Sequence, residues 1–308
     1  MQSIRTDLAK EAVALDNGQE IEGVGVYDFK VDEDIAVSRV EIKNDQGAKE
    51  IGKKIGTYVT VECPELYEKD ENLIAKVAHT FADEITRMMG GYKKAQNILI
   101  IGLGNRNVTP DALGPLVCEK VFVSRHIKKY LPNMIDSRVA EVSAISPGVL
   151  GVTGLETAEV IDGVVDKIKP DMIVVIDALA SRSISRIGTS LQVSNAGISP
   201  GSGIGNKRRA IDQETLGIPV LAVGIPMVVY AYTIASEILL SAAMKSNTSE
   251  GQIKNVINMI QDIEGSDMIV TPKNIDMLID NASDLIARAL NFSIHKDLSE
   301  EEIKRYMS

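Results

Sequence analysis

Two aspartates occupy positions typical of catalytic residues, just after apolar stretches typical of buried strands. Asp177 directly ends the run 172–176, and Asp111 follows a short turn after the run 97–101. A short continuous apolar run is typical of a parallel strand buried on both faces. In open α/β sheets, sites form outside the carboxyl ends of such strands. We therefore expect Asp111 and Asp177 to meet in one crevice.

Paired carboxylates in a dry site either share a proton or share a cation. In the first case one acid has a raised pKa and the other stays ionised, so the pair can activate water and protonate a leaving amine. In the second case a divalent metal polarises a carbonyl and binds the water. Each acid also has a structural interpretation. Asp111 can complement a helix dipole, and Asp177 can cap the loop that follows it.

Strands and helices alternate through the part of the chain that carries these acids. Alternation of this kind predicts parallel strand pairing and a three-layer α/β/α sandwich with a mostly parallel sheet. Strands are expected at 97–101, 172–176, 186–193 and 220–224. Helices are expected at 72–89, 111–129, 157–168, 228–243, 251–263 and 273–290.

A smaller antiparallel β unit is predicted near the N-terminus, over residues 22–63. Its Val- and Ile-rich segments alternate with charged residues, which is typical of half-buried strands, and Asn44–Gly47 is expected to be a turn between two of them. We expect a single domain over residues 1–308, with the α/β core at 95–291.

Composition excludes several classes of function. The 308-residue chain has a formal net charge of −10, which disfavours direct binding to nucleic acid or anionic lipid. No stretch has the roughly 18 apolar residues that a membrane span needs. Cys63 and Cys118 are the only cysteines, so we expect reduced thiols in a cytoplasmic compartment, with Cys118 buried and inert.

Other motifs lack the context that their chemistry requires. The segment 102–107 lacks the third glycine of a dinucleotide fingerprint. The segment 197–201 matches G-x-S-x-G, but a glycine-rich stretch follows where a nucleophile elbow needs a helix. The histidines His79, His126 and His295 are scattered, without the spacing of metal ligands. We therefore expect no metal and no cofactor from these motifs.

Longer motifs around the acids resemble those of the spore germination proteases. The similarity covers nearly the whole chain, and motifs of this length are specific. The matching segments are 3–9 (SIRTDLA), 51–54 (IGKK), 58–60, 102–105, 108–115 (VTPDALGP), 146–157, 176–183 (IDALASRS), 199–208, 214–219, 224–226 and 270–273.

The resemblance implies a fold similar to that of the hydrogenase maturation proteases. It implies that Asp111 and Asp177 are the essential acids of an atypical aspartic-type endopeptidase with no established cofactor. Such a protein is a homotetramer in the forespore or spore core, where it degrades small acid-soluble spore proteins. The family is made as a zymogen that loses a short N-terminal segment. Here only Met1 and Gln2 precede a start that is similar to the mature one.

Substrate-binding residues are expected from the same resemblance at Gly104, Asn105, Ser202, Lys207 and Arg208. The glycines of the loop 199–206 would permit it to close over a substrate. Because the family cuts near glutamates, Lys207, Arg208 and the adjacent Arg209 are expected to bind acidic side chains. The alternative for these cations is a solvated basic turn.

Overall fold

The computed structural model describes residues 6–14, 21–67, 71–90, 96–199, 209–246, 256–257, 259–260, 263 and 265–307. Within this part of the chain, nine strands form one sheet in the order β1-β2-β3-β7-β8-β6-β4-β5, with β9 paired to β8. The strands are β1 (Val24–Lys30), β2 (Ala36–Ile42), β3 (Gly56–Glu62), β4 (Asn97–Gly102), β5 (Glu141–Ile145), β6 (Met172–Ser181), β7 (Ser190–Ser194), β8 (Val220–Tyr230) and β9 (Ile269–Val270).

The parallel half of the sheet consists of β8, β6, β4 and β5. Its central strands β4 and β6 are buried on both faces, which explains their continuous apolar runs. Helices cover this half on both sides. The predicted α/β/α sandwich with a parallel central sheet is thus confirmed.

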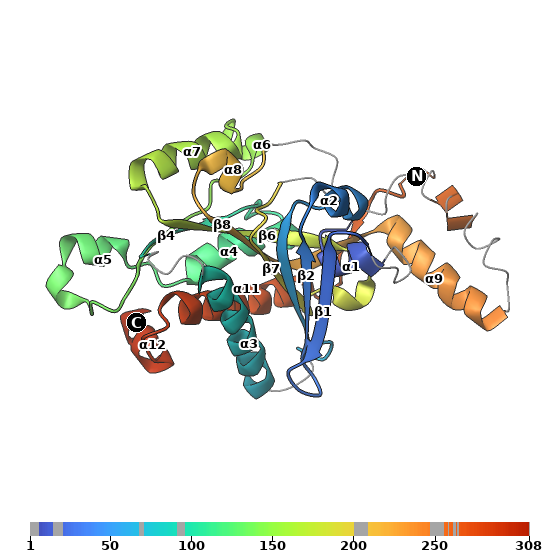
Figure 1. The fold of residues 1–308 in the computed structure, drawn as a ribbon, viewed down its shortest axis with the longest axis horizontal. Helices are drawn as coiled ribbons and strands as arrows, with labels where there is room; N and C mark the ends of the chain where they lie inside the picture. The colour runs from blue at the N-terminus through green and yellow to red at the C-terminus, as the bar shows by residue number, and fades with distance from the viewer. Residues whose placement is uncertain are drawn as a thin grey trace.

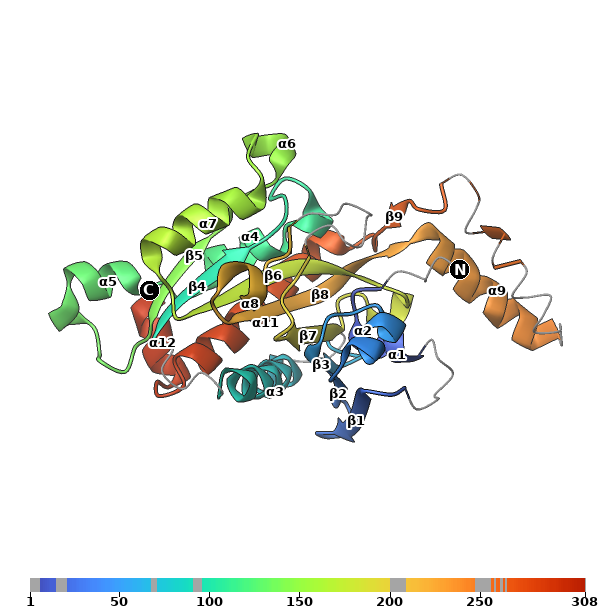
Figure 2. The ribbon, with the colours of Figure 1, turned by 45° about the horizontal axis from the view of Figure 1, so that its top comes forward.

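The helices lie in two layers, as Figure 1 shows. On one face, α7 (Thr157–Ile168) and α8 (Gln213–Leu216) cover Leu99, Ile173 and Val175. On the other, α3 (Glu71–Met89), α4 (Leu113–Lys120) and α11 (Ile275–Ile294) cover Ile100 and Val174. The remaining elements include α5 (Arg125–Tyr130), α6 (Leu150–Thr153) and α12 (Glu300–Met307), and Figure 2 shows α5 and α12 at the end of the molecule opposite α9 (Ala231–Ser246).

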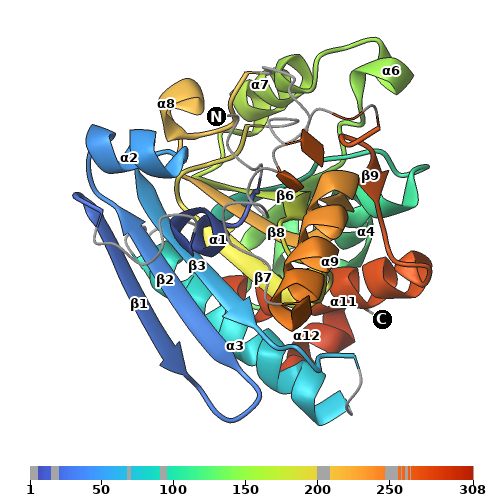
Figure 3. The same cartoon turned by 90° about the vertical axis from the view of Figure 1, so that its right-hand side faces the viewer.

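The antiparallel half, β1-β2-β3-β7, continues the same sheet because β7 pairs with both β3 and β8. Figure 3 shows β1, β2 and β3 side by side, with α3 across them. Helices α1 (Ala9–Ala14) and α2 (Asp45–Ile51) cover the other face. The expected turn at Asn44–Gly47 is wrong. The Asn44 carboxamide oxygen accepts from the Gly47 N–H at 2.8 Å and caps the start of α2.

The helix expected at 111–129 is also wrong, because the chain leaves α4 after Lys120 and begins α5 at Arg125. Between them, the Ser124 N–H donates to the Val142 oxygen at 3.0 Å, so the chain bonds to β5 instead of continuing the helix. The edge strand β5 gains a partner in this way.

Other expected elements differ only at their ends. Strand β8 extends to Tyr230, so the helix predicted from 228 begins at Ala231, and β7 begins at Ser190 instead of 186. Most of the helix predicted at 251–263 lies outside the described residues. No helix in the described ranges is long and apolar enough to cross a membrane.

Candidate active site

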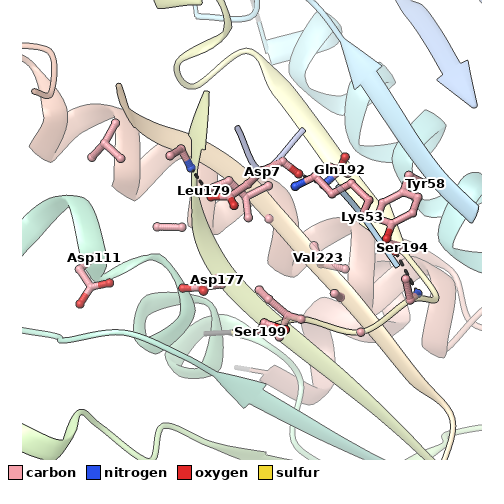
Figure 4. Close-up of a pocket in the computed structure, with 18 of the residues that line it drawn as sticks. Asp7, Lys53, Tyr58, Asp111, Asp177, Leu179, Gln192, Ser194, Ser199 and Val223 are labelled. Carbon is pink, nitrogen blue, oxygen red and sulfur yellow. Dashed lines mark hydrogen bonds between the residues drawn. The ribbon is translucent and has the colours of Figure 1, made fainter. Parts of the chain in front are cut away.

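A cavity of 630 Å³ opens beside the carboxyl-terminal half of β6, and both Asp111 and Asp177 line it. Figure 4 shows these acids arriving on separate elements, with Asp7, Lys53 and Gln192 on another wall. The volume is within the usual range for a ligand pocket. The structure therefore places the predicted pair in one crevice at the expected edge of the sheet.

Asp177 lies within β6, and the expectation that it ends this strand is wrong. The strand continues to Ser181 because β8 runs beside it, with Asp177 opposite Gly224. A β-carbon on Gly224 would lie 2.5 Å from the Asp177 carbonyl oxygen, so a glycine is needed there. Asp177 alternates onto the face of Ile173 and Val175, whose side chains pack beneath α7.

Asp111 ends a short 3₁₀ turn, Thr109–Asp111, that precedes α4. One carboxylate oxygen, Oδ2, accepts a hydrogen bond of 2.7 Å from the backbone N–H of Asn105. Gly104 has φ +109°, and a β-carbon there would lie 2.0 Å from the Asp111 carbonyl oxygen. The segment from Gly104 to Asp111 thus fixes the acid through one backbone donor and one close backbone contact.

Two contacts join the turn that carries Asp111 to the strands beside it, and the first is a tight contact between β4 and α4. A β-carbon on Gly102 would lie 2.2 Å from the Gly114 carbonyl oxygen, so neither glycine leaves room for a side chain. The Leu103 N–H then donates to the Ile176 carbonyl oxygen at 2.8 Å. The residue before Asp177 is thereby tied to the turn that carries Asp111.

Another wall of the cavity comes from the N-terminal segment and was missed by sequence reasoning as a functional region. The Asp7 N–H donates to the Ala180 oxygen at 2.9 Å, and the Asp7 carboxylate accepts from the Ala180 N–H at 2.8 Å. Lys53 donates to the Thr6 oxygen at 2.7 Å. Asp7 and Lys53 belong to the segments SIRTDLA and IGKK, which carry the family resemblance, and this was the signal available.

Burial and charge act in opposite directions on Lys53. Burial lowers the pKa of this ammonium below its usual value, while the negative charges of Asp7 and Glu11 oppose that effect. Lys54, which also lines the cavity, forms an ion pair with Asp212. The wall formed by Asp7, Lys53 and Lys54 thus carries charges of both signs.

The structure describes some of the predicted substrate-binding residues and leaves others outside the described ranges. Gly104 and Asn105 lie against Asp111, as described above, so their direct role toward a substrate stays a prediction. Ser202, Lys207 and Arg208 lie outside the described residues. Arg209 forms an ion pair with Asp162 on α7 and donates to the Thr215 oxygen at 3.2 Å.

The residues that line the cavity can be compared with what a serine nucleophile or a metal site would need. Ser199 of the G-x-S-x-G segment is on the cavity wall, but none of the three histidines, all within the described ranges, lines it. A serine nucleophile would therefore lack a histidine base there. In the described part of the chain, no three His, Cys, Asp or Glu side chains gather into a group that could hold a metal ion.

Comparison with known proteins defines the class as peptidases. A family model described as germination protease matches residues 3–246. The germination protease of Caldanaerobacter subterraneus subsp. tengcongensis is 43% identical, covering 99% of this chain and 98% of that relative. Those of Clostridium perfringens (41% identical, complete coverage of both chains) and a Geobacillus strain (36%, covering 99% and 97%) are also similar.

The chain therefore belongs to the germination protease family. Among solved structures, a [NiFe] hydrogenase maturation protease, HycI from Thermococcus kodakarensis, covers 66% of this chain at 16% identity with a TM-score of 0.35. A similarity at this level adds nothing to the assignment, which depends on the family match and the full-length relatives.

Proposed function

We propose that this chain is an endopeptidase that begins the degradation of small acid-soluble spore proteins during spore germination, with Asp111 and Asp177 as its catalytic pair. One observation carries the proposal. Acids from motifs far apart in sequence line the same cavity beside β6, within a chain that belongs to a peptidase family.

The chemistry follows from the charge states of two neighbouring carboxyl groups. One ionised carboxylate takes a proton from water as the water oxygen attacks the scissile carbonyl carbon. The other, protonated, gives its proton to the amide nitrogen as the C–N bond breaks. The products are one carboxylic acid and one amine, and the two acids exchange protonation states in the process. The Asn105 N–H holds Oδ2 of Asp111 at 2.7 Å, and the scheme works with either acid as the base.

Incubation with a small acid-soluble spore protein, read by mass spectrometry, tests the activity and reports the cleaved bond. Asp111→Asn and Asp177→Asn should each lower kcat by about 10²- to 10⁴-fold while the protein stays folded. Asp83→Asn, on the exposed side of α3, is the matched control and should cleave normally. Full activity in either cavity variant would remove that acid from catalysis.

The proposal extends to assembly and location. We place the protein in the forespore and spore core, as a homotetramer that binds neither nucleic acid nor membrane directly. Sedimentation of the purified protein measures the assembly.

A strong chelator followed by metal add-back tests the proton-sharing scheme, because loss and recovery of cleavage would indicate a metal between the acids. Binding of the spore protein without cleavage by the unmodified chain would indicate an inactive, substrate-binding member.

A further inference from the structure

We propose that the backbone N–H and C=O of Ala178 form a subsite that binds the main chain of the substrate as an extended strand. The proposal rests on the endopeptidase function above and adds how a protein segment is held beside the acids. It commits to one kind of occupant, an extended polypeptide segment of the substrate.

Alternation along β6 decides where the backbone groups of Ala178 point. The Ile173 N–H donates to the Pro219 oxygen at 2.9 Å, on the side of β8. The Ile176 oxygen accepts from the Leu103 N–H at 2.8 Å, on the opposite side, where β4 lies. Residues two apart in a strand direct their backbone groups to the same side. Ala178 therefore directs its N–H and C=O away from β8, to the side of β4.

On that side the position next to Ala178 is left open. Strand β4 ends at Gly102, and Leu103 makes the last bond to β6. Two residues further along β6, Asp7 occupies both backbone groups of Ala180. Between these contacts, no described residue bonds to the N–H or C=O of Ala178 on the side of β4. An unpaired strand edge of this kind is a template for another chain.

Ala178 also lies beside the two acids proposed as the catalytic pair. It follows Asp177 directly, and both line the cavity that contains Asp111. Strand addition to a sheet edge is a general mode of peptide binding, in which main-chain hydrogen bonds provide affinity and flanking pockets provide selectivity. A main chain held by Ala178 would keep its amides in a fixed position relative to the acids, which is what positioning requires for catalysis.

The open position is narrow, and this restricts the substrate. Leu103 bounds it on one side and Asp7 on the other, so a bound segment has a single residue of β6 to pair with. A helical segment already uses its backbone N–H and C=O groups internally. The site therefore selects segments that are extended or unfolded when they bind.

Hydrogen exchange resolved to single amides tests the subsite on the full chain with Asp111→Asn, which should slow cleavage and does not change the sequence of β6. The probe is the tightest binder among overlapping synthetic peptides that tile one small acid-soluble spore protein. Peptide binding should slow exchange at Ala178 about tenfold or more. The Ala180 amide is the internal control, because the Asp7 carboxylate already holds it at 2.8 Å.

Either of two results would overturn the proposal. One is peptide binding without any change at Ala178. The other is an Ala178 amide that is already as protected as Ala180 in the free chain, which would mean that another segment of this chain occupies the position. Absence of binding by every tiled peptide would equally count against it.

In the proposed subsite the Ala178 carbonyl oxygen accepts a hydrogen bond from one N–H of the peptide. An N-methyl scan of the same peptide tests this bond. Methylation of one peptide nitrogen should weaken binding about tenfold, roughly the loss of one hydrogen bond, while methylation of its immediate neighbours should have little effect. Equal tolerance at all positions would contradict strand addition. These readouts measure binding, so they remain informative if Asp111→Asn still cleaves, a result that would reject the acid assignment alone.

Discussion

A β-carbon on Gly104 would lie 2.0 Å from the carbonyl oxygen of Asp111. No side chain fits at that distance, and the φ of +109° at Gly104 independently favours glycine. The adjacent Asn105 N–H holds the Asp111 carboxylate at 2.7 Å. The position of this acid therefore depends on a residue that has no side chain.

Gly104→Ala should lower kcat by about a hundredfold, because a shift of about 1 Å in the turn would misplace the Asp111 carboxylate. Steady-state kinetics on a spore-protein substrate measures the effect. Gly163→Ala is the matched control. Gly163 lies in α7, where an added β-carbon would point into open space, so this change should keep activity and raise helix stability by up to about 1 kcal/mol. Normal kcat in Gly104→Ala would show that the turn tolerates displacement.

Gln192→Met should weaken the wall of the cavity built by the N-terminal segment. The buried Gln192 carboxamide accepts from the Ala9 N–H at 2.9 Å and donates to the Asp7 oxygen at 3.1 Å. Methionine has a similar volume but leaves both backbone groups unpaired, at a cost of about 1–3 kcal/mol in the free energy of unfolding. Chemical denaturation measures that loss. Gln46→Met on the exposed face of α2 should change stability by less than about 0.5 kcal/mol.

If the N-terminal segment also positions substrate, KM should rise in Gln192→Met while Gln46→Met leaves it unchanged. A Gln192→Met protein that unfolds like the unmodified chain would show that the Gln192 hydrogen bonds to Asp7 and Ala9 contribute nothing to the free energy of unfolding.

The Cys118 thiol should react slowly in the folded protein. Burial raises its pKa to about 11, so the reactive thiolate is scarce near neutral pH. Iodoacetamide at pH 8 should label Cys118 and the buried Cys63 far more slowly than the same thiols in denaturant, as counted by mass spectrometry. Rapid labelling of Cys118 in the native chain would indicate that the helix α4 opens from β4.

His295 should make the fold sensitive to mild acid. Its ring is fully buried beside Phe122, and burial lowers its pKa from 6.5 to about 4. Between these pH values the unfolded chain binds a proton that the folded chain does not. The free energy of unfolding should therefore fall as pH drops from 6.5 to 4, by up to about 3 kcal/mol.

Denaturation curves at several pH values measure this slope. The variant His295→Gln retains an acceptor for the Ala140 N–H, which bonds to Nδ1 at 3.3 Å, but it has no titration in this range. Its slope between pH 6.5 and 4 should be shallower than that of the unmodified chain. Equal slopes in the two proteins would assign the acid sensitivity to other groups.

Sequence alone determined the class of fold and predicted that Asp111 and Asp177 would line one crevice. The buried runs of β4 and β6 are apolar at every core position, because strands covered on both faces have no solvent-facing side. Helix α7 was predicted with the bounds that the structure has, since its apolar spacing, its capping box and the αL residue Lys169 before Pro170 are all local signals. Long motifs were sufficient to place the chain in its family.

Tertiary structure alone decided how the site is built. The extension of β6 past Asp177 depends on β8 running beside it, and the end of α4 depends on bonds to β5, both of which join residues distant in sequence. The same holds for Asp7 at Ala180 and for Leu103 at Ile176. Hydrogen bonds between distant segments leave no periodic pattern in either one. For that reason the bonds that join Asp7 to Ala180, and the open backbone position at Ala178, could be found only in the folded chain.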